Sequence, residues 1–171
     1  MTITHNLRKL ALTLHVVTSV GWVGAVSGFL VLAIAGLAGA DAQLMRGSYL
    51  AMDLTYRSVI VPLGLASLTT GLVSSLTTDW GLFRHYWVLV KVLLTVPATF
   101  LMLVHMQPVS YLAGVAAATA LSSADARGLR IQLVAYAGAA LLVLLAATVL
   151  STYKPRGRTR YGVRRLKERS A

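Results

Sequence analysis

Four long apolar blocks dominate this sequence and constrain what the chain can fold into. They cover roughly residues 10–37, 58–76, 86–104 and 129–150. A block of about 18 or more apolar residues is long enough to cross a bilayer as an α-helix. Only 12% of the 171 residues are charged, against about 25% in soluble domains, which leaves too few polar side chains to cover a water-soluble globule. We therefore expect an all-α integral membrane protein, an antiparallel four-helix transmembrane bundle.

Two apolar segments have a competing interpretation. The first block precedes an Ala-Gly-Ala sequence at residues 38–40, as in a cleaved signal peptide, but it is longer than the apolar region of about 7–15 residues in such peptides. A fifth apolar stretch at 109–121 has only thirteen residues. Because this is too short to cross the hydrocarbon layer of about 30 Å, we expect it to lie flat or to dip into the interface.

The basic residues predict the orientation of the helices. Eight of the 16 Lys and Arg residues belong to a basic tail over 154–171, and Arg8, Lys9 and Arg84 would lie on the same side of the membrane. Only four arginines would lie on the other side. Basic flanks stay in the cytoplasm, so we expect a multi-pass protein of the cell membrane with both termini cytoplasmic. The tail should attract anionic lipids, and no motif for nucleic-acid binding accompanies it.

Lys91 and His15 are ionisable side chains that lie well inside the apolar blocks. Such a group costs about 2.5–3.5 kcal/mol to insert at membrane depth, which favours a functional role. Lys91 lies four residues after Trp87 and His15 six residues after Lys9, which predicts similar depths on helices that run in the same direction. No acid lies at that depth. The pair is suited to an anionic cofactor, with the imidazole ligating a metal and the ammonium pairing with a carboxylate.

Plainer interpretations of both residues remain open. Lys91 can extend its ammonium to the cytoplasmic headgroups, and His15 can be a buried neutral ring bonded to a hydroxyl or carbonyl group. His15, Ser19 and Trp22 share one helical face. Our candidate cofactor-binding residues are therefore His15, Lys91, Trp22 and Ser19, with His15 as the ligand of a haem iron.

A second candidate metal site lies at the outer end of the third block. Met102, His105 and Met106 are close in sequence, and thioether and imidazole ligands suit Cu(I). The alternative is that the methionines fill packing gaps near the interface.

Some functions are excluded or disfavoured by what the sequence lacks. There is no cysteine, which excludes disulfides and thiolate metal sites. No arrangement typical of a serine hydrolase, a kinase or a zinc protease occurs. Gly24 and Gly28 form a GxxxG motif, which permits close helix approach within the chain, in a homo-oligomer or in a larger membrane complex. A non-catalytic accessory or assembly subunit is therefore an alternative function.

The sequence also resembles known membrane proteins. The run LHVVTSVGWVG at residues 14–24 is similar to the first span of a group that includes the CopD copper-resistance domain and the HemJ-type protoporphyrinogen oxidase. The whole chain most resembles an actinobacterial-type family of four-span membrane proteins, through WGLFRHYW at 80–87 and YKPRG at 153–157. The elements shared with the wider group are His15, Trp22, Gly24, Pro62, Gly71, Trp87 and Lys91.

The resemblance implies a cofactor. In HemJ-type enzymes the residues matching His15 and Lys91 are implicated in haem-dependent activity, so the resemblance implies binding of b-type haem or a related porphyrin between the first and third spans. The Arg- and His-bearing stretch of HemJ is replaced here by apolar residues 25–35, so the motif for oxidase activity is incomplete. The similarity to CopD implies copper handling as a further alternative.

Overall fold

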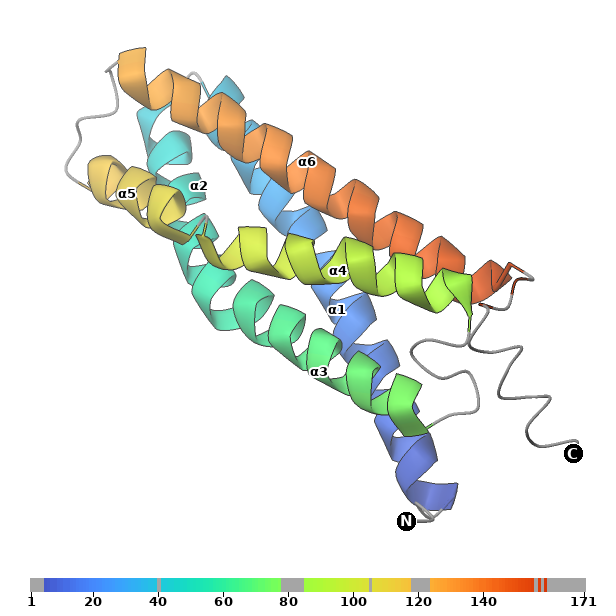
Figure 1. Ribbon diagram of the computed structural model, residues 1–171. Helices are drawn as coiled ribbons and strands as arrows, with labels where there is room; N and C mark the ends of the chain where they lie inside the picture. The colour runs from blue at the N-terminus through green and yellow to red at the C-terminus, as the bar shows by residue number, and fades with distance from the viewer. Residues whose placement is uncertain are drawn as a thin grey trace, which may run out of the picture.

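The described part of the chain is helical. The computed structural model describes residues 5–39, 41–77, 85–104, 106–117, 124–155, 157 and 159, and none of them forms a strand that pairs into a sheet. The elements pack into a bundle in which the chain enters α1 and leaves α6 toward the same end (Figure 1). They are α1 (His5–Ala38), α2 (Ala42–Thr55), the π-helical turn η1 (Tyr56–Ile60), α3 (Val61–Thr77), α4 (Tyr86–Val104), α5 (Met106–Ala117) and α6 (Ala124–Tyr153).

Four helical segments are long and apolar enough to cross a membrane. They comprise Asn6–Ala38, Ala42–Leu76, Tyr86–Ala116 and Arg127–Tyr153. This confirms the predicted number of candidate spans. The first has 33 residues, which at a rise of 1.5 Å per residue makes it about 50 Å long. Since the hydrocarbon layer is about 30 Å thick, helices of this length reach beyond it or cross it at a tilt.

The second candidate span begins well before the predicted start at residue 58. The side chain of Asp41 accepts hydrogen bonds from the backbone N–H groups of Gln43 and Leu44, which caps α2. The helix then continues through η1 into α3. Pro62 has no backbone N–H to donate, and the turn directly before it is π-helical, as expected where the regular hydrogen-bond ladder is interrupted.

The short apolar stretch after α4 packs against α2. Here α5 covers Met106–Ala117 and contacts α2 along the bundle. A polar cluster joins the two: Arg57 Nε lies 3.0 Å from Asp53 Oδ1, and the Ser110 hydroxyl donates to the same carboxylate at 2.8 Å. Asp53 and Arg57 are four residues apart, which places them on one side of a helix and allows this ion pair. Its link to Ser110 was not predicted, because the sequence does not say which helix lies beside α2.

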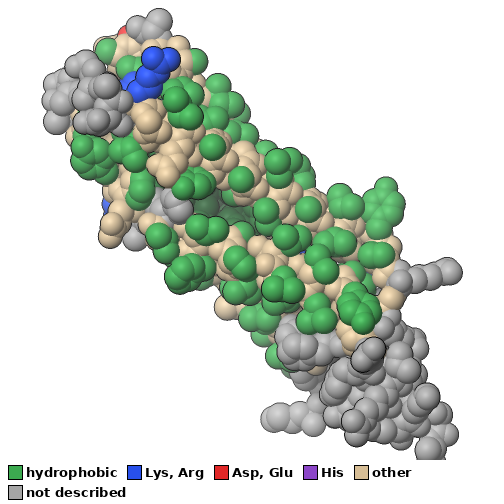
Figure 2. Space-filling view, turned by 45° about the horizontal axis from the view of Figure 1, so that its top comes forward, with side chains coloured by type: hydrophobic (Ala, Val, Ile, Leu, Met, Phe, Trp, Pro, Cys, Tyr) green, Lys and Arg blue, Asp and Glu red, His purple; other side chains and the backbone are tan. Residues whose placement is uncertain are grey.

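The core and the exterior are both apolar. Trp22, Phe29, Met52, Tyr56 and Leu112 belong to one buried cluster contributed by α1, α2, η1 and α5. Large apolar side chains also cover the exterior (Figure 2). A water-soluble protein rarely exposes a continuous apolar surface of this extent. The surface therefore has the composition of one that contacts lipid tails.

The end of α6 is set by its backbone. Lys154 has a positive φ of 43°, and Pro155 follows directly, a combination that stops helices. The backbone N–H of Tyr86, in the first turn of α4, donates to the carbonyl oxygen of Gly157 at 3.3 Å. Most of the basic tail at 154–171 lies outside the described residues.

Candidate functional site

The structure brings His15 of α1 and Lys91 of α4 into direct contact. The Lys91 ammonium nitrogen Nζ lies 3.3 Å from Nε2 of His15, although the residues are 76 positions apart in sequence. Lys91 also donates to the hydroxyl of Ser151 on α6 at 2.8 Å. Both His15 and Lys91 are half-buried. The two ionisable residues that the sequence places at one depth therefore lie side by side within the bundle.

The partners of His15 define its protonation pattern. Nδ1 lies 3.1 Å from the carbonyl oxygen of Ser67, which can only accept, so Nδ1 carries the proton. An ammonium can only donate, so Nε2 presents its lone pair to Lys91. The ring is thus a neutral imidazole whose lone pair is directed at α4. This is the tautomer expected of a histidine that ligates a metal through Nε2.

Helix α3 shapes the pocket of the imidazole. The ring lies against Gly71, where an added Cβ atom would come within 2.8 Å of His15 Cε1. The hydroxyls of Ser19 and Ser67 are 2.8 Å apart, and Thr70 Oγ1 lies 3.4 Å from Nδ1. Hydroxyls therefore surround the imidazole on the side away from Lys91.

Lys91 is bonded to neutral groups. An ammonium has three N–H donors, and in the described part of the chain two of them meet His15 and Ser151. The Ser151 hydroxyl in turn donates to the carbonyl oxygen of Ala147 at 2.8 Å. These dipolar partners solvate the ammonium without neutralising its charge.

Trp22 lies apart from this cluster. Its indole packs against Gly64, where a Cβ atom would come within 3.0 Å of the ring. His15 and Trp22 are seven residues apart on α1, as are Gly64 and Gly71 on α3. Each large ring on α1 thus fits the space left by one glycine on α3. Of the predicted cofactor-binding residues, His15, Ser19 and Lys91 come together and Trp22 does not.

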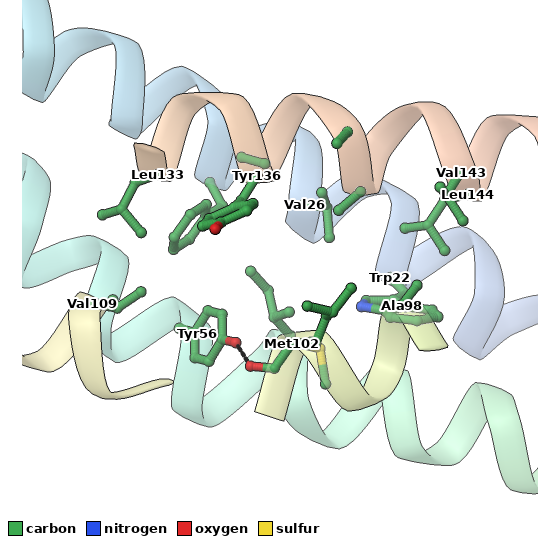
Figure 3. Close-up of a pocket in the computed structure, with 16 residues that line it drawn as sticks. Trp22, Val26, Tyr56, Ala98, Met102, Val109, Leu133, Tyr136, Val143 and Leu144 are labelled. Carbon is green, nitrogen blue, oxygen red and sulfur yellow. Dashed lines mark hydrogen bonds between the residues drawn. The ribbon is translucent and has the colours of Figure 1, made fainter. Parts of the chain in front are cut away.

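Trp22 instead borders an apolar cavity of about 180 Å³. Figure 3 shows its indole toward one end, Met102 next to it, and Tyr56 and Tyr136 toward the other end. The Tyr56 hydroxyl donates to the carbonyl oxygen of Met102, in the last turn of α4, where helix carbonyls lack partners within the helix. The indole nitrogen of Trp22 is buried and has no hydrogen-bond partner among the described residues.

The predicted copper ligands are only partly described. Met102 lies at the cavity, with its terminal methyl close to Gly64. His105 lies outside the described residues, as does the side chain of Met106. The copper site stays a prediction.

The side chains of His15 and Lys91 have the chemistry to bind a porphyrin, but the space next to them is too small for one. The bond from Nδ1 to a carbonyl fixes an axial histidine, and Lys91 offers a cation for a carboxylate. However, Lys91 occupies the position in front of Nε2. The nearby cavity is similar to the 150 Å³ cavity that holds one benzene molecule, so a porphyrin macrocycle does not fit into it.

Sequence reasoning missed Ser67, Thr70 and Ser151. Ser67 and Thr70 carry hydroxyls within an apolar block, and Ser151 directly follows one. Such residues are a weak signal because their hydroxyls also bond to their own helix, as Thr70 does to Ala66. No protein-family model, curated protein or solved structure matches this chain. A function must therefore be argued from the site itself.

Proposed function

We propose that this chain is a multi-pass membrane protein that binds the acid group of a membrane-soluble ligand at the His15–Lys91 pair. In this proposal the bundle is inserted as four antiparallel spans with both termini in the cytoplasm. The observation that carries it is the contact of the Lys91 ammonium with a neutral imidazole and a hydroxyl. A carboxylate would be a stronger partner than either.

The physical reason is the cost of a charge at membrane depth. Ionisable side chains in spans are expensive and usually pair with one another or with a ligand. Replacing the imidazole by an anion would pair the ammonium with an opposite charge, whereas its present partners are neutral. The same exchange would free the lone pair of His15 Nε2. A ligand that carries both an acid group and a Lewis-acidic centre could therefore bind both residues, the acid group at Lys91 and the Lewis-acidic centre at His15 Nε2.

We propose b-type haem or a related porphyrin as this ligand. His15 would hold the iron through Nε2, with the Ser67 carbonyl orienting the ring, and Lys91 would pair with a propionate. Bound haem would supply a redox-active iron whose chemistry depends on its axial ligand and surroundings. Gly71 supports this assignment, because it allows the imidazole to lie close to α3 and to keep its orientation.

Space for the ligand would have to be created between α1 and α4. Helix α1 packs mainly on α2, α3 and α6, and α4 packs mainly on α3 and α6. The His15–Lys91 bond therefore connects two helices that share little other packing. A ligand that takes over both side chains would replace this bond, and room for it would require α4 to shift against α3 and α6, on which both helices pack.

An absorption spectrum tests the haem assignment. Protein purified in detergent from haem-replete cells should show a Soret band, and His15→Ala should abolish it. His85→Ala is the matched control, because His85 precedes α4 and is not part of the cluster around Lys91, so this variant should keep the band. Wild-type protein that stays colourless after reconstitution with haem would refute the haem assignment.

A second candidate function is that of an accessory subunit. Gly24 and Gly28 are exposed on α1, and a Cβ atom added to either would meet nothing within 4 Å. The GxxxG motif is therefore not used for packing within the described chain. Such a surface allows another membrane helix to approach closely, which favours a homo-oligomer or a larger membrane complex.

A further inference from the structure

We propose that the cavity beside Trp22 is a binding site for a neutral, ring-sized lipophilic molecule that carries a carbonyl group. The ligand would enter from the lipid phase and accept a hydrogen bond from the indole N–H. This site is separate from the His15–Lys91 pair, since neither residue lines the cavity. The inference therefore does not depend on the proposed function.

The unpartnered indole nitrogen points to an acceptor on the ligand. Trp22 is only 4% exposed, and its Nε1 has no hydrogen-bond partner in the described chain. Figure 3 shows this nitrogen on the side of the ring that faces the cavity. Buried donors are nearly always satisfied, because leaving one without an acceptor costs free energy. The hydroxyls of Tyr56 and Tyr136 bond to Met102 and Gln132, and neither forms a hydrogen bond with the indole nitrogen.

The residues that line the cavity make water and charged molecules unfavourable occupants. Among the residues that the structure describes, no Lys, Arg, His, Asp or Glu side chain lines the cavity. A buried water needs two to four polar partners; the indole N–H offers one, and the hydroxyls of Tyr56 and Tyr136, which also line the cavity, already bond to the protein. An ion would be desolvated without compensation. A neutral molecule with one acceptor and an otherwise apolar surface matches the lining.

The size and position of the cavity further restrict the class of ligand that can bind. Its volume of about 180 Å³ is suited to a single six-membered ring with a small substituent, by comparison with the benzene-binding cavity of about 150 Å³. Figure 2 shows a hollow in the apolar face of the molecule, among side chains suited to contact lipid. The cavity is bordered by α4 and α6, through residues such as Ala98 and Val143. A molecule dissolved in the bilayer would thus reach Trp22 without crossing a polar surface.

Indole NMR signals test the proposal directly. The chain has three tryptophans, so protein labelled with ¹⁵N-tryptophan gives three indole N–H signals in micelles, and Trp22→Phe assigns one of them. Acetophenone and ethylbenzene have similar shapes, but only acetophenone has a carbonyl oxygen. Acetophenone should move the Trp22 signal downfield to saturation and leave the other two in place. Ethylbenzene at the same concentration should produce no downfield shift.

A variant that fills the cavity provides a second test in the same NMR experiment. Ala98→Leu should remove the saturable shift, whereas Ala146→Leu on the exposed surface of α6 should keep it. Equal effects of the two compounds would overturn the proposal and indicate that the cavity takes any apolar chain. A shift of all three signals in parallel, as from partitioning into the micelle, would also overturn it. The comparison of the two compounds uses wild-type protein, and Trp80→Phe and Trp87→Phe assign the other two signals, so the test stands even if Trp22→Phe or Ala98→Leu fails to fold.

Discussion

The ring of His15 occupies the space that Gly71 leaves on α3. An added Cβ atom would lie 2.8 Å from Cε1 of the imidazole. Any larger residue must therefore push the ring toward Lys91 or separate α1 from α3. The orientation of His15 thus depends on a glycine that carries no chemistry of its own.

The first prediction concerns this glycine. Gly71→Val should destabilise the folded protein by about 1–3 kcal/mol, as overpacking of a filled interior does, and should lower haem retention. Thermal unfolding in detergent and the Soret absorbance measure the two effects. Gly128→Val is the control, because a Cβ atom there meets nothing within 4 Å. Normal stability and retention in Gly71→Val would show that the fit of His15 against α3 is unimportant.

The second prediction concerns the ammonium. Lys91→Met should weaken ligand retention roughly 10- to 100-fold, since a hydrogen bond to a charged group contributes about 1.5–3 kcal/mol. The thermal stability of the unliganded protein should not fall, because the variant buries no charge. Lys154→Met, at the exposed end of α6, should change neither quantity. Unchanged retention in Lys91→Met would argue against an acid group at this site.

The third prediction distinguishes the accessory-subunit function. Replacing both Gly24 and Gly28 by Leu should reduce self-association or co-purification with partner subunits, because leucines prevent close helix approach. The Soret band should be unaffected. Cross-linking in native membranes, with Gly128→Leu as the control, measures the change. If the double variant associates as the wild type does, this face of α1 is simply covered by lipid.

The fourth prediction is the topology. Reporter fusions after Ser75 and after Ala171 should report the cytoplasm, and fusions after Ala42 and after Ala120 should report the outside. The reason is the excess of basic residues at the predicted cytoplasmic ends. A C-terminal reporter on the outside would contradict the proposed orientation.

The fifth prediction concerns the basic tail. Truncation after Lys154 removes seven of the eight tail charges and should weaken binding to anionic vesicles, by about 1 kcal/mol for each charge close to the surface. Flotation with vesicles of phosphatidylserine and phosphatidylcholine, at low and high salt, measures the effect. The same lipid preference in full-length and truncated protein would show that the tail does not recognise lipid charge.

The sequence predicted the long helices and the common depth of His15 and Lys91, because apolar length and axial rise are properties of single helices. Apart from the proximity of the first and third spans that the family resemblance implies, it did not predict which helices are neighbours. Ser151 was therefore missed, although it accepts a bond from Lys91. Trp22 was grouped with His15 because the two share a helical face. Seven residues correspond to about 10 Å along the axis, which places Trp22 at a different site.

The hydrogen bond from Tyr86 to the Gly157 carbonyl attaches the start of the tail to α4. The chain leaves α6 at Tyr153, yet three residues beyond Lys154 its backbone is fastened to the first turn of the helix that carries Lys91. Through this bond the start of the tail contacts α4 as well as α6, to which it is covalently attached. Lys91 lies five residues further along α4, so a displacement of the tail would be transmitted over a short distance to the helix that carries the ammonium.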